Sequence, residues 1–275
     1  MWPEVDAKIA VRTTAGPERN GRVDILGFLV DKMTLHQCVD RLTAAIPLGR
    51  VQHIVLLNAA KIVRARADAE LAHIIRTADL VGADGVSLVW TSRILSRPLP
   101  GRVNGTDLMN LLIEVSAQRG YRIYFLGSTP AWIEKAVANV QKKYPALQVA
   151  GYRNGYFSCR EEERQAVADI AAAKADILLV GMGTPMKEKW VRHHIRELAT
   201  PVIHGVGGSF DILAGHVKRA PLWMQQWGLE WFYRFLQEPR RLWRRYLVTN
   251  LIFIGLVMSQ KFKLWFNFRS GADAG

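Results

Sequence analysis

Several common functional motifs are missing from this chain. Its only cysteines, Cys38 and Cys159, show neither CxxC nor zinc-ligand spacing, which excludes a disulfide framework and fits a reducing compartment. The turn Gly205-Val206-Gly207-Gly208 lacks the third glycine of the dinucleotide-binding fingerprint, and no GxxxxGK loop occurs. These absences disfavour dehydrogenases and P-loop nucleotide triphosphatases.

Metal-binding patterns are also scarce. No Asp-x-Asp occurs, although many nucleotide-sugar enzymes use such carboxylates to hold a divalent metal on a diphosphate. The adjacent His193 and His194 would point to different faces of a helix and make a poor metal site. We therefore predict no metal and no cofactor. An enzyme acting on diphosphates would need protein cations instead, such as Arg102.

Long apolar runs are absent too, and the N-terminal segment has no apolar stretch typical of a secretory signal. Residues 1–22 are polar and are predicted to form a flexible leader. The longest apolar run, Leu251 to Met258, is far shorter than the ~20 residues that span a bilayer. Any attachment to a membrane is therefore predicted to be peripheral or monotopic.

Positive charge and aromatic side chains are concentrated near the C-terminus. The net charge is +13, and residues 217–275 contain ten of the 37 lysines and arginines, three of the 24 acids and 13 of the 26 aromatic residues. Aromatic rings prefer the membrane interface and cations attract anionic lipid. This mixture predicts a helical, membrane-associating appendage over 221–275. A helical domain with an ordinary aromatic core is the alternative.

Two spacings describe the predicted appendage. Aromatic residues recur every four positions before Pro239, which predicts one apolar helix face. They are Trp223, Trp227, Trp231 and Phe235. Four arginines then follow on one or two helical turns, and such crowded like charges favour a bound anion, with a solvated basic face as the alternative. They are Arg240, Arg241, Arg244 and Arg245.

Residues 23–220 alternate short β-rich runs with amphipathic helical stretches. This alternation predicts an α/β fold with a Rossmann-like parallel sheet core in two halves. The predicted strands cover 24–30, 51–57, 79–81, 122–126, 147–150, 177–180 and 202–206. The predicted helices cover 34–46, 59–77, 86–95, 131–143, 161–174 and 185–198. Thr34 and Gln37 form a capping box that marks the start of the first helix.

Polar residues at the ends of these strands are the candidates for function, because ligands bind beyond the carboxyl ends of parallel strands. Such residues occur at Asn58, at Asp84 and in three glycine-containing turns, 127–129, 181–184 and 205–211. Asp84 lies between Ala83 and Gly85 at the head of a predicted helix, a position suited to a general base. An N-cap of that helix is the alternative role for Asp84.

Four segments carry a more specific combination of residues. They are Leu57-Asn58-Ala59; Ala83-Asp84-Gly85 with Arg102-Val103-Asn104-Gly105-Thr106-Asp107; Val180 to Trp190; and Gly205 to Asp211. The last continues through Gly215, Arg219-Ala220-Pro221, Gly228-Leu229-Glu230-Trp231 and Arg240-Arg241. From about residue 24 to residue 247 the chain therefore resembles the WecG/TagA/CpsF family of bacterial glycosyltransferases, glycosyltransferase family 26.

The resemblance implies an inverting, metal-independent transferase. It would move a sugar from a UDP-sugar to an undecaprenyl-diphosphate-linked saccharide during cell-surface polysaccharide biosynthesis, at the cytoplasmic face of the bacterial inner membrane. Asp84 matches the catalytic base, Arg102 an arginine that stabilises the departing diphosphate, and Asn58 an active-site polar residue. The positions expected to contact the substrates are Gly127, Gly183, Lys187, Glu188, Gly207, Gly208, Asp211, Arg234, Arg241 and Arg244.

Two positions depart from the family pattern. Leu56 replaces a threonine, which leaves Asn58 to act without that hydroxyl. Lys187 replaces a glutamine and places a cation near the expected nucleotide, which favours phosphate. Two further hypotheses remain: a non-catalytic, membrane-associated polysaccharide assembly protein and a nucleic-acid-binding module. No recognised nucleic-acid motif occurs, so no nucleic-acid partner is predicted. Exposed aromatic surface would permit a homo-oligomer.

Overall fold

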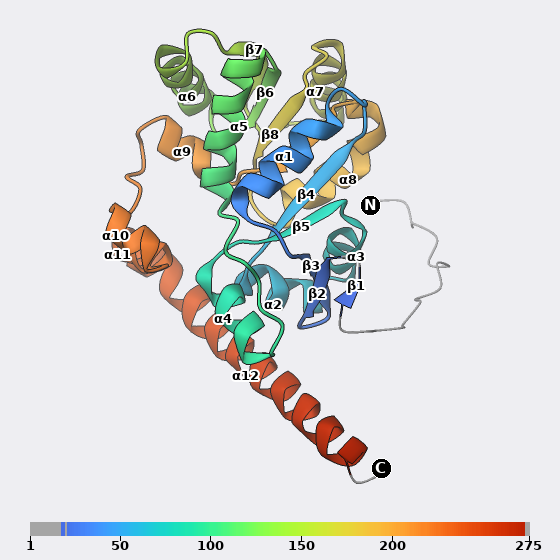
Figure 1. Cartoon of the computed structure of the whole chain (residues 1–275). Helices are drawn as coiled ribbons and strands as arrows, with labels where there is room; N and C mark the ends of the chain where they lie inside the picture. Colours follow the sequence, from blue (N-terminus) through green and yellow to red (C-terminus); the bar gives the residue numbers. More distant parts are fainter. Residues whose placement is uncertain (1–17, 20, 273–275) are drawn as a thin grey trace.

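Six parallel strands form the central sheet, in the order β5-β4-β9-β8-β6-β7 (Figure 1). They are β4 (Gln52–Leu57), β5 (Leu80–Ala83), β6 (Arg122–Gly127), β7 (Gln148–Arg153), β8 (Ile177–Gly181) and β9 (Val202–Gly205). The chain builds one edge with β4 and β5, the other with β6 and β7, and fills the centre with β8 and β9. This computed structural model, which describes residues 18–19 and 21–272, confirms the predicted α/β class and agrees with a Rossmann-like core.

Helices cover both faces of this sheet. One face packs against α1 (Leu35–Ala45), α5 (Gly105–Arg119), α6 (Pro130–Lys143) and α9 (Ser209–Leu213). The other packs against α2 (Ala59–Ala67), α3 (Ala69–Thr77), α7 (Arg160–Ala172) and α8 (Met186–Leu198). Leu56 contributes to the first core, whereas Val55 and Leu57 contribute to the second. Burial on both faces explains why the strands are continuous apolar runs in the sequence.

Two predicted elements were wrong. The single strand at 24–30 is a hairpin of β2 (Arg22–Ile25) and β3 (Phe28–Asp31), which joins β1 (Glu18–Arg19) in a separate antiparallel sheet. Gly27, at φ 86°, permits the turn. The helix at 59–77 is divided because Asp68 is extended and accepts a hydrogen bond from the Leu71 amide as the N-cap of α3. The predicted leader, residues 1–22, contains β1 and the first residue of β2. Residues 1–17 and 20 lie outside the described part of the chain.

The C-terminal region is helical, as predicted, but its elements differ. It forms α10 (Leu222–Gln226), α11 (Glu230–Gln237) and α12 (Pro239–Ala272). Gly228, at φ 71°, separates α10 from α11, so the four evenly spaced aromatic residues do not share one helix face. In Figure 1, α12 runs diagonally past α4 (Val86–Ile94) and α2.

Helix α12 is attached to the core along part of its length. Phe253 and Val257 are buried in the cluster that includes α2, and Gln260 Oε1 accepts a hydrogen bond of 3.0 Å from the Leu26 amide. Residues Leu247–Trp265 are nevertheless long and apolar enough to cross a membrane by length and composition, with 11% of the segment buried. The prediction considered only the unbroken apolar run, whereas this longer segment also includes neutral polar residues and two lysines, Lys261 and Lys263.

Candidate active site

The carboxyl ends of β4, β5 and β9 open into a cavity of about 710 Å³. Residues from α4, α11 and α12 form its other walls. Seven of the sequence-predicted site residues line this cavity: Asn58, Asp84, Arg102, Lys187, Gly207, Gly208 and Arg234. The fold therefore brings together residues that lie up to about two thirds of the chain apart.

Asp84 directly follows β5, and its backbone amide donates a 2.7 Å hydrogen bond to Leu57 O on β4. The N-cap of α4 is Gly85, and no side chain caps this helix, so the alternative role of Asp84 as an N-cap was wrong. Burial raises the pKa of the Asp84 carboxyl; Lys61 opposes this shift, Glu230 adds to it, and the Gly105 amide and Arg102 oppose it. Asp84 is thus a desolvated carboxyl among cations that favour its ionised form.

A buried histidine contacts the peptide group next to the backbone amide that binds Asp84. His204, on β9, lies 3.1 Å through its Nε2 from the carbonyl oxygen of Gly105. Burial lowers the pKa of His204 to about 4, so the ring is neutral near pH 7. Because the carbonyl only accepts, Nε2 carries the proton and donates, which leaves Nδ1 as a buried acceptor. His204 therefore fixes the peptide group between Gly105 and Thr106, which follows the Gly105 amide that stabilises the Asp84 carboxylate.

Asn58 and Lys61 begin the neighbouring helix. Asn58 Oδ1 caps α2 by accepting a 2.9 Å hydrogen bond from the Lys61 amide. This bond occupies the Asn58 side-chain oxygen, so the side-chain nitrogen is the group that can donate a hydrogen bond to a ligand. Lys61 Nζ is buried 2.8 Å from Glu188 Oε1 and 2.7 Å from Leu56 O. Sequence reasoning missed Lys61, although a lysine in the first turn after a polar strand end was a usable signal.

Glu188 holds two lysines beneath the cavity. Besides Lys61, it lies 3.2 Å from Lys187 Nζ, which also donates a 2.7 Å hydrogen bond to Thr184 Oγ1. Burial alone would raise the pKa of Glu188, but Lys61 and Lys187 outweigh it and lower this pKa to about 2. Burial, reinforced by Lys61, lowers the pKa of Lys187 to about 8. The two lysines therefore lie among two carboxylates, because Asp84 also interacts electrostatically with both of them.

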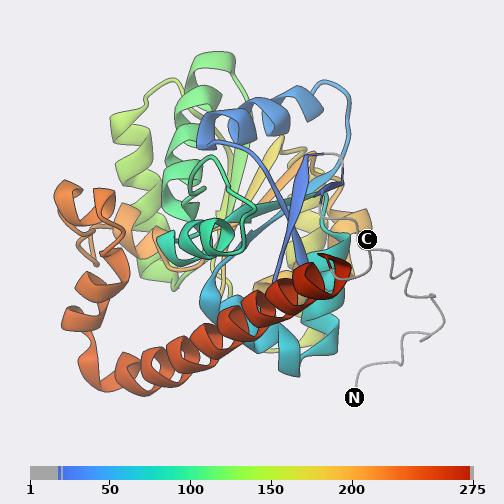
Figure 2. The same cartoon turned by 60° about the horizontal axis from the view of Figure 1, so that its bottom comes forward.

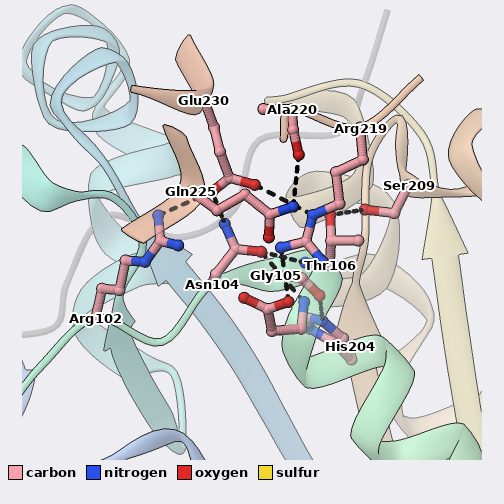
Figure 3. Close-up of polar contacts among 11 residues, drawn as sticks. Arg102, Asn104, Gly105, Thr106, His204, Ser209, Arg219, Ala220, Gln225 and Glu230 are labelled. Carbon is pink, nitrogen blue, oxygen red and sulfur yellow. Dashed lines mark hydrogen bonds and ion pairs between the residues drawn. The ribbon is translucent and has the colours of Figure 1, made fainter. Parts of the chain in front are cut away.

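A second ionic cluster joins the appendage to the core (Figure 3). Glu230, at the start of α11, accepts hydrogen bonds of 2.8 Å from Arg102 Nη1 and 3.2 Å from Asn104 Nδ2. Its other carboxylate oxygen accepts one of 3.2 Å from Arg219 Nε, and Arg219 Nη2 lies 2.6 Å from Asp107 Oδ1. Arg102 is therefore oriented by Glu230 through one nitrogen, while its other N–H groups remain available to a ligand. Sequence reasoning gave Glu230 no role.

Arg234, one turn after Glu230, reaches the glycine turn that follows β9. A Cβ atom on Gly208 would lie 3.1 Å from Arg234 Nη2, so the missing side chain lets the guanidinium approach the turn. Among the residues that the structure describes, Arg234 forms no ion pair. It is a cation within reach of an anion in the cavity.

The remaining predicted substrate-binding residues do not line this cavity. Asp211 accepts a 3.0 Å hydrogen bond from Ser128 Oγ, and Glu188 lies under the two lysines. Gly127 has φ 140°, and an added Cβ would lie 2.5 Å from the Gly181 backbone, so it is required for close strand packing. Gly183 lies in the turn between β8 and α8. The side chains of Arg241 and Arg244 lie outside the described residues.

Within the described ranges, no three His, Cys, Asp or Glu side chains are grouped to hold a metal ion.

Comparison with known proteins gives concordant matches. The model of the Glycosyl transferase WecG/TagA/CpsF family matches residues 23–267. A Bacillus spizizenii protein named N-acetylglucosaminyldiphosphoundecaprenol N-acetyl-beta-D-mannosaminyltransferase is 34% identical over 174 residues, which are 63% of this chain and 66% of that protein. A Bacillus subtilis protein of the same name is 32% identical over 200 residues, which are 72% of this chain and 76% of that protein.

Proposed function

The chain belongs to the WecG/TagA/CpsF family of glycosyltransferases, and on this premise we propose that it transfers a sugar from a UDP-sugar to an undecaprenyl-diphosphate-linked saccharide. The relatives' name contains N-acetylmannosamine as the transferred sugar and N-acetylglucosaminyl-diphospho-undecaprenol as the acceptor. This pair is therefore the first donor and acceptor to test. The observation that carries the proposal is that Asp84 and several cations line one cavity at the carboxyl ends of the strands.

The proposed reaction is a single displacement with inversion. The Asp84 carboxylate takes the proton of the acceptor hydroxyl while the hydroxyl oxygen forms a bond to the anomeric carbon of the donor sugar. The bond between that carbon and the diphosphate oxygen breaks, and its electron pair leaves with the nucleoside diphosphate. Burial raises the pKa of Asp84, and Lys61 and the Gly105 amide act against that shift in favour of the ionised form that this step requires.

Protein cations neutralise the diphosphate in this proposal. Lys187 and Arg234 line the cavity, and their cationic groups support an anion site there. Arg102 contributes through the N–H groups that Glu230 does not use. A preorganised donor of this kind is worth about 3 kcal/mol to the transition state. Asn58, the turn at Gly207 and Gly208, and the further predicted residues remain candidates for substrate contacts.

The appendage is proposed to bring the site to a membrane surface that contains the lipid acceptor. Exposed apolar residues on α12, such as Leu251 and Phe262, support this contact. Phe253, Val257 and Gln260 hold the same segment against the core, which favours a helix lying along the membrane surface over one that crosses it. We propose that this contact occurs at the cytoplasmic face of the membrane, where nucleotide sugars are available. Residues 23–220 form the proposed catalytic core.

A transfer assay tests this function. Purified full-length protein, UDP-N-acetylmannosamine and a synthetic N-acetylglucosaminyl diphosphate lipid should give a disaccharide lipid with inverted anomeric configuration, measured by NMR. The reaction should proceed with a chelator present. Retention of configuration would contradict the single displacement. No product with a panel of UDP-sugars would favour the non-catalytic assembly protein.

A further inference from the structure

The cavity has two chemically different halves. The half near the strand ends contains Asp84 and the cations described above. The other half, between α4 and α12, is apolar. It is lined by Trp90, Ile94, Phe253, Ile254, Val257 and Met258. Because both halves belong to one cavity, a ligand held at the polar end can continue into the apolar end without leaving the protein.

One face of α4 leads from the polar half to the apolar half. Ser87, Trp90 and Ile94 all line the cavity, and their spacing of three and four places them on the same helix face. From Asp84 to Ile94 the chain advances by about 15 Å at the rise of an α-helix. Along this distance the lining changes from a carboxylate and a hydroxyl to an indole and an aliphatic side chain.

The opposite wall, on α12, shows the same change. Thr249 and Asn250 line the cavity first, followed by Phe253 and Ile254 and then by Val257 and Met258. Phe253 and Val257 are buried against the core and fix the helix in place. Figure 2 shows α12 crossing this side of the molecule.

Several of the apolar lining residues are largely exposed. The exposed fraction is 54% for Trp90 and 47% for Ile94 on α4, and 57% for Ile254 and 51% for Met258 on α12. Apolar side chains that face each other across a cavity and remain exposed are typical of a binding site for an apolar ligand.

We propose that this apolar half binds the isoprene units of the acceptor that lie next to its diphosphate. The inference rests on the proposed function, which requires an acceptor with a saccharide, a diphosphate and a polyprenyl chain in that order. The cavity offers a catalytic carboxylate, then polar lining, then apolar lining, which is the matching order. The exposed apolar side of α12 beside it, including Leu251, gives the rest of the chain a route into lipid.

Photolabelling tests the site independently of transfer. The full-length protein is mixed with a prenyl diphosphate of three isoprene units that carries a diazirine on the last unit and no sugar. Labelled peptides should come from α4 and α12, and unlabelled prenyl diphosphate should compete. Labelling confined to other elements, or equal competition by a diacyl phospholipid, would overturn the proposal and assign the surface to general lipid contact.

A kinetic comparison tests the same site during transfer. Wild-type protein should show a KM about tenfold lower for an acceptor with three isoprene units than for one with a single unit, about 1.4 kcal/mol of binding. Ile94→Ser and Ile254→Ser should each lose most of this preference. Leu48→Ser is the matched control, because Leu48 is an exposed apolar residue outside α12 that does not line the cavity. An equal preference for the longer acceptor in all four proteins would overturn the proposed binding of isoprene units in the apolar half. Absence of transfer by the wild type would contradict the proposed function, and the photolabelling result would then decide the binding site.

Discussion

Replacing Glu230 with Gln tests the ionic cluster that joins α11 to the core. The carboxylate accepts hydrogen bonds from Arg102, Asn104 and Arg219, and the two arginine bonds are charge-assisted. Hydrogen bonds to charged groups contribute about 1.5–3 kcal/mol each when buried, whereas exposed ion pairs contribute under about 1 kcal/mol. These side chains are about one fifth exposed, and glutamine can still accept one bond. We therefore expect a loss of about 1–2 kcal/mol.

This loss should appear in stability and in catalysis. In a double-mutant cycle with Arg102→Gln, urea unfolding should give a coupling energy of about 1 kcal/mol. Because Arg102 would lose its fixed orientation, kcat should fall about tenfold, which corresponds to about 1.4 kcal/mol. Glu230 also raises the pKa of Asp84, so its neutral replacement should move the acid limb of the kcat/KM profile to lower pH.

The direction of the pH change is the stringent part of this prediction. A structural disturbance alone would lower activity without moving the acid limb. Glu134→Gln serves as the control, since Glu134 is an exposed residue of α6 that does not line the cavity. Additive effects of the Arg102 and Glu230 substitutions, or an acid limb moved to higher pH, would refute the role assigned to Glu230.

Three further predictions concern the other charged residues. Lys61→Met removes a cation that lowers the pKa of Asp84, so the acid limb of kcat/KM should move to higher pH; an unchanged limb would contradict the coupling. Arg234→Gln should raise the donor Kd, measured by calorimetry, about tenfold through loss of a charge-assisted contact, whereas the exposed control Arg164→Gln should not. The pKa of Glu188 is lowered from 4.5 to about 2, so its stabilisation is complete above pH 4.5 and decreases as the pH falls toward 2. Urea unfolding should show wild type losing up to about 3 kcal/mol across this range, and Glu188→Gln should lack that slope.

Local patterns were sufficient to predict the sheet and the position of Asp84. Apolar runs such as 177–180 are strands because parallel strands are buried on both faces, and Asp84 follows one of them. The hairpin at Gly27 was missed because apolar residues flank the turn on both sides. The break at Asp68 was missed because a single extended residue interrupts two amphipathic helices of the same period.

Contacts between residues far apart in the sequence could not be predicted at the site. Glu230 and Arg102 are 128 residues apart, and only the folded chain shows that the carboxylate orients the guanidinium. The packing of α12 was hidden for the same reason. Nothing in the sequence distinguishes the buried Phe253 from the exposed apolar residues of α12. The sequence could therefore predict an appendage, but not that the appendage forms one wall of the cavity.

The central claim is that the Asp84 carboxylate accepts the proton of the acceptor hydroxyl. Asp84→Asn keeps the shape of the side chain and an oxygen for the Gly105 amide, so transfer and donor binding can be compared in one protein. The account predicts that kcat falls by about 10²–10⁴-fold while the donor Kd, measured by calorimetry, changes by less than about twofold. A variant that retains wild-type turnover would contradict it.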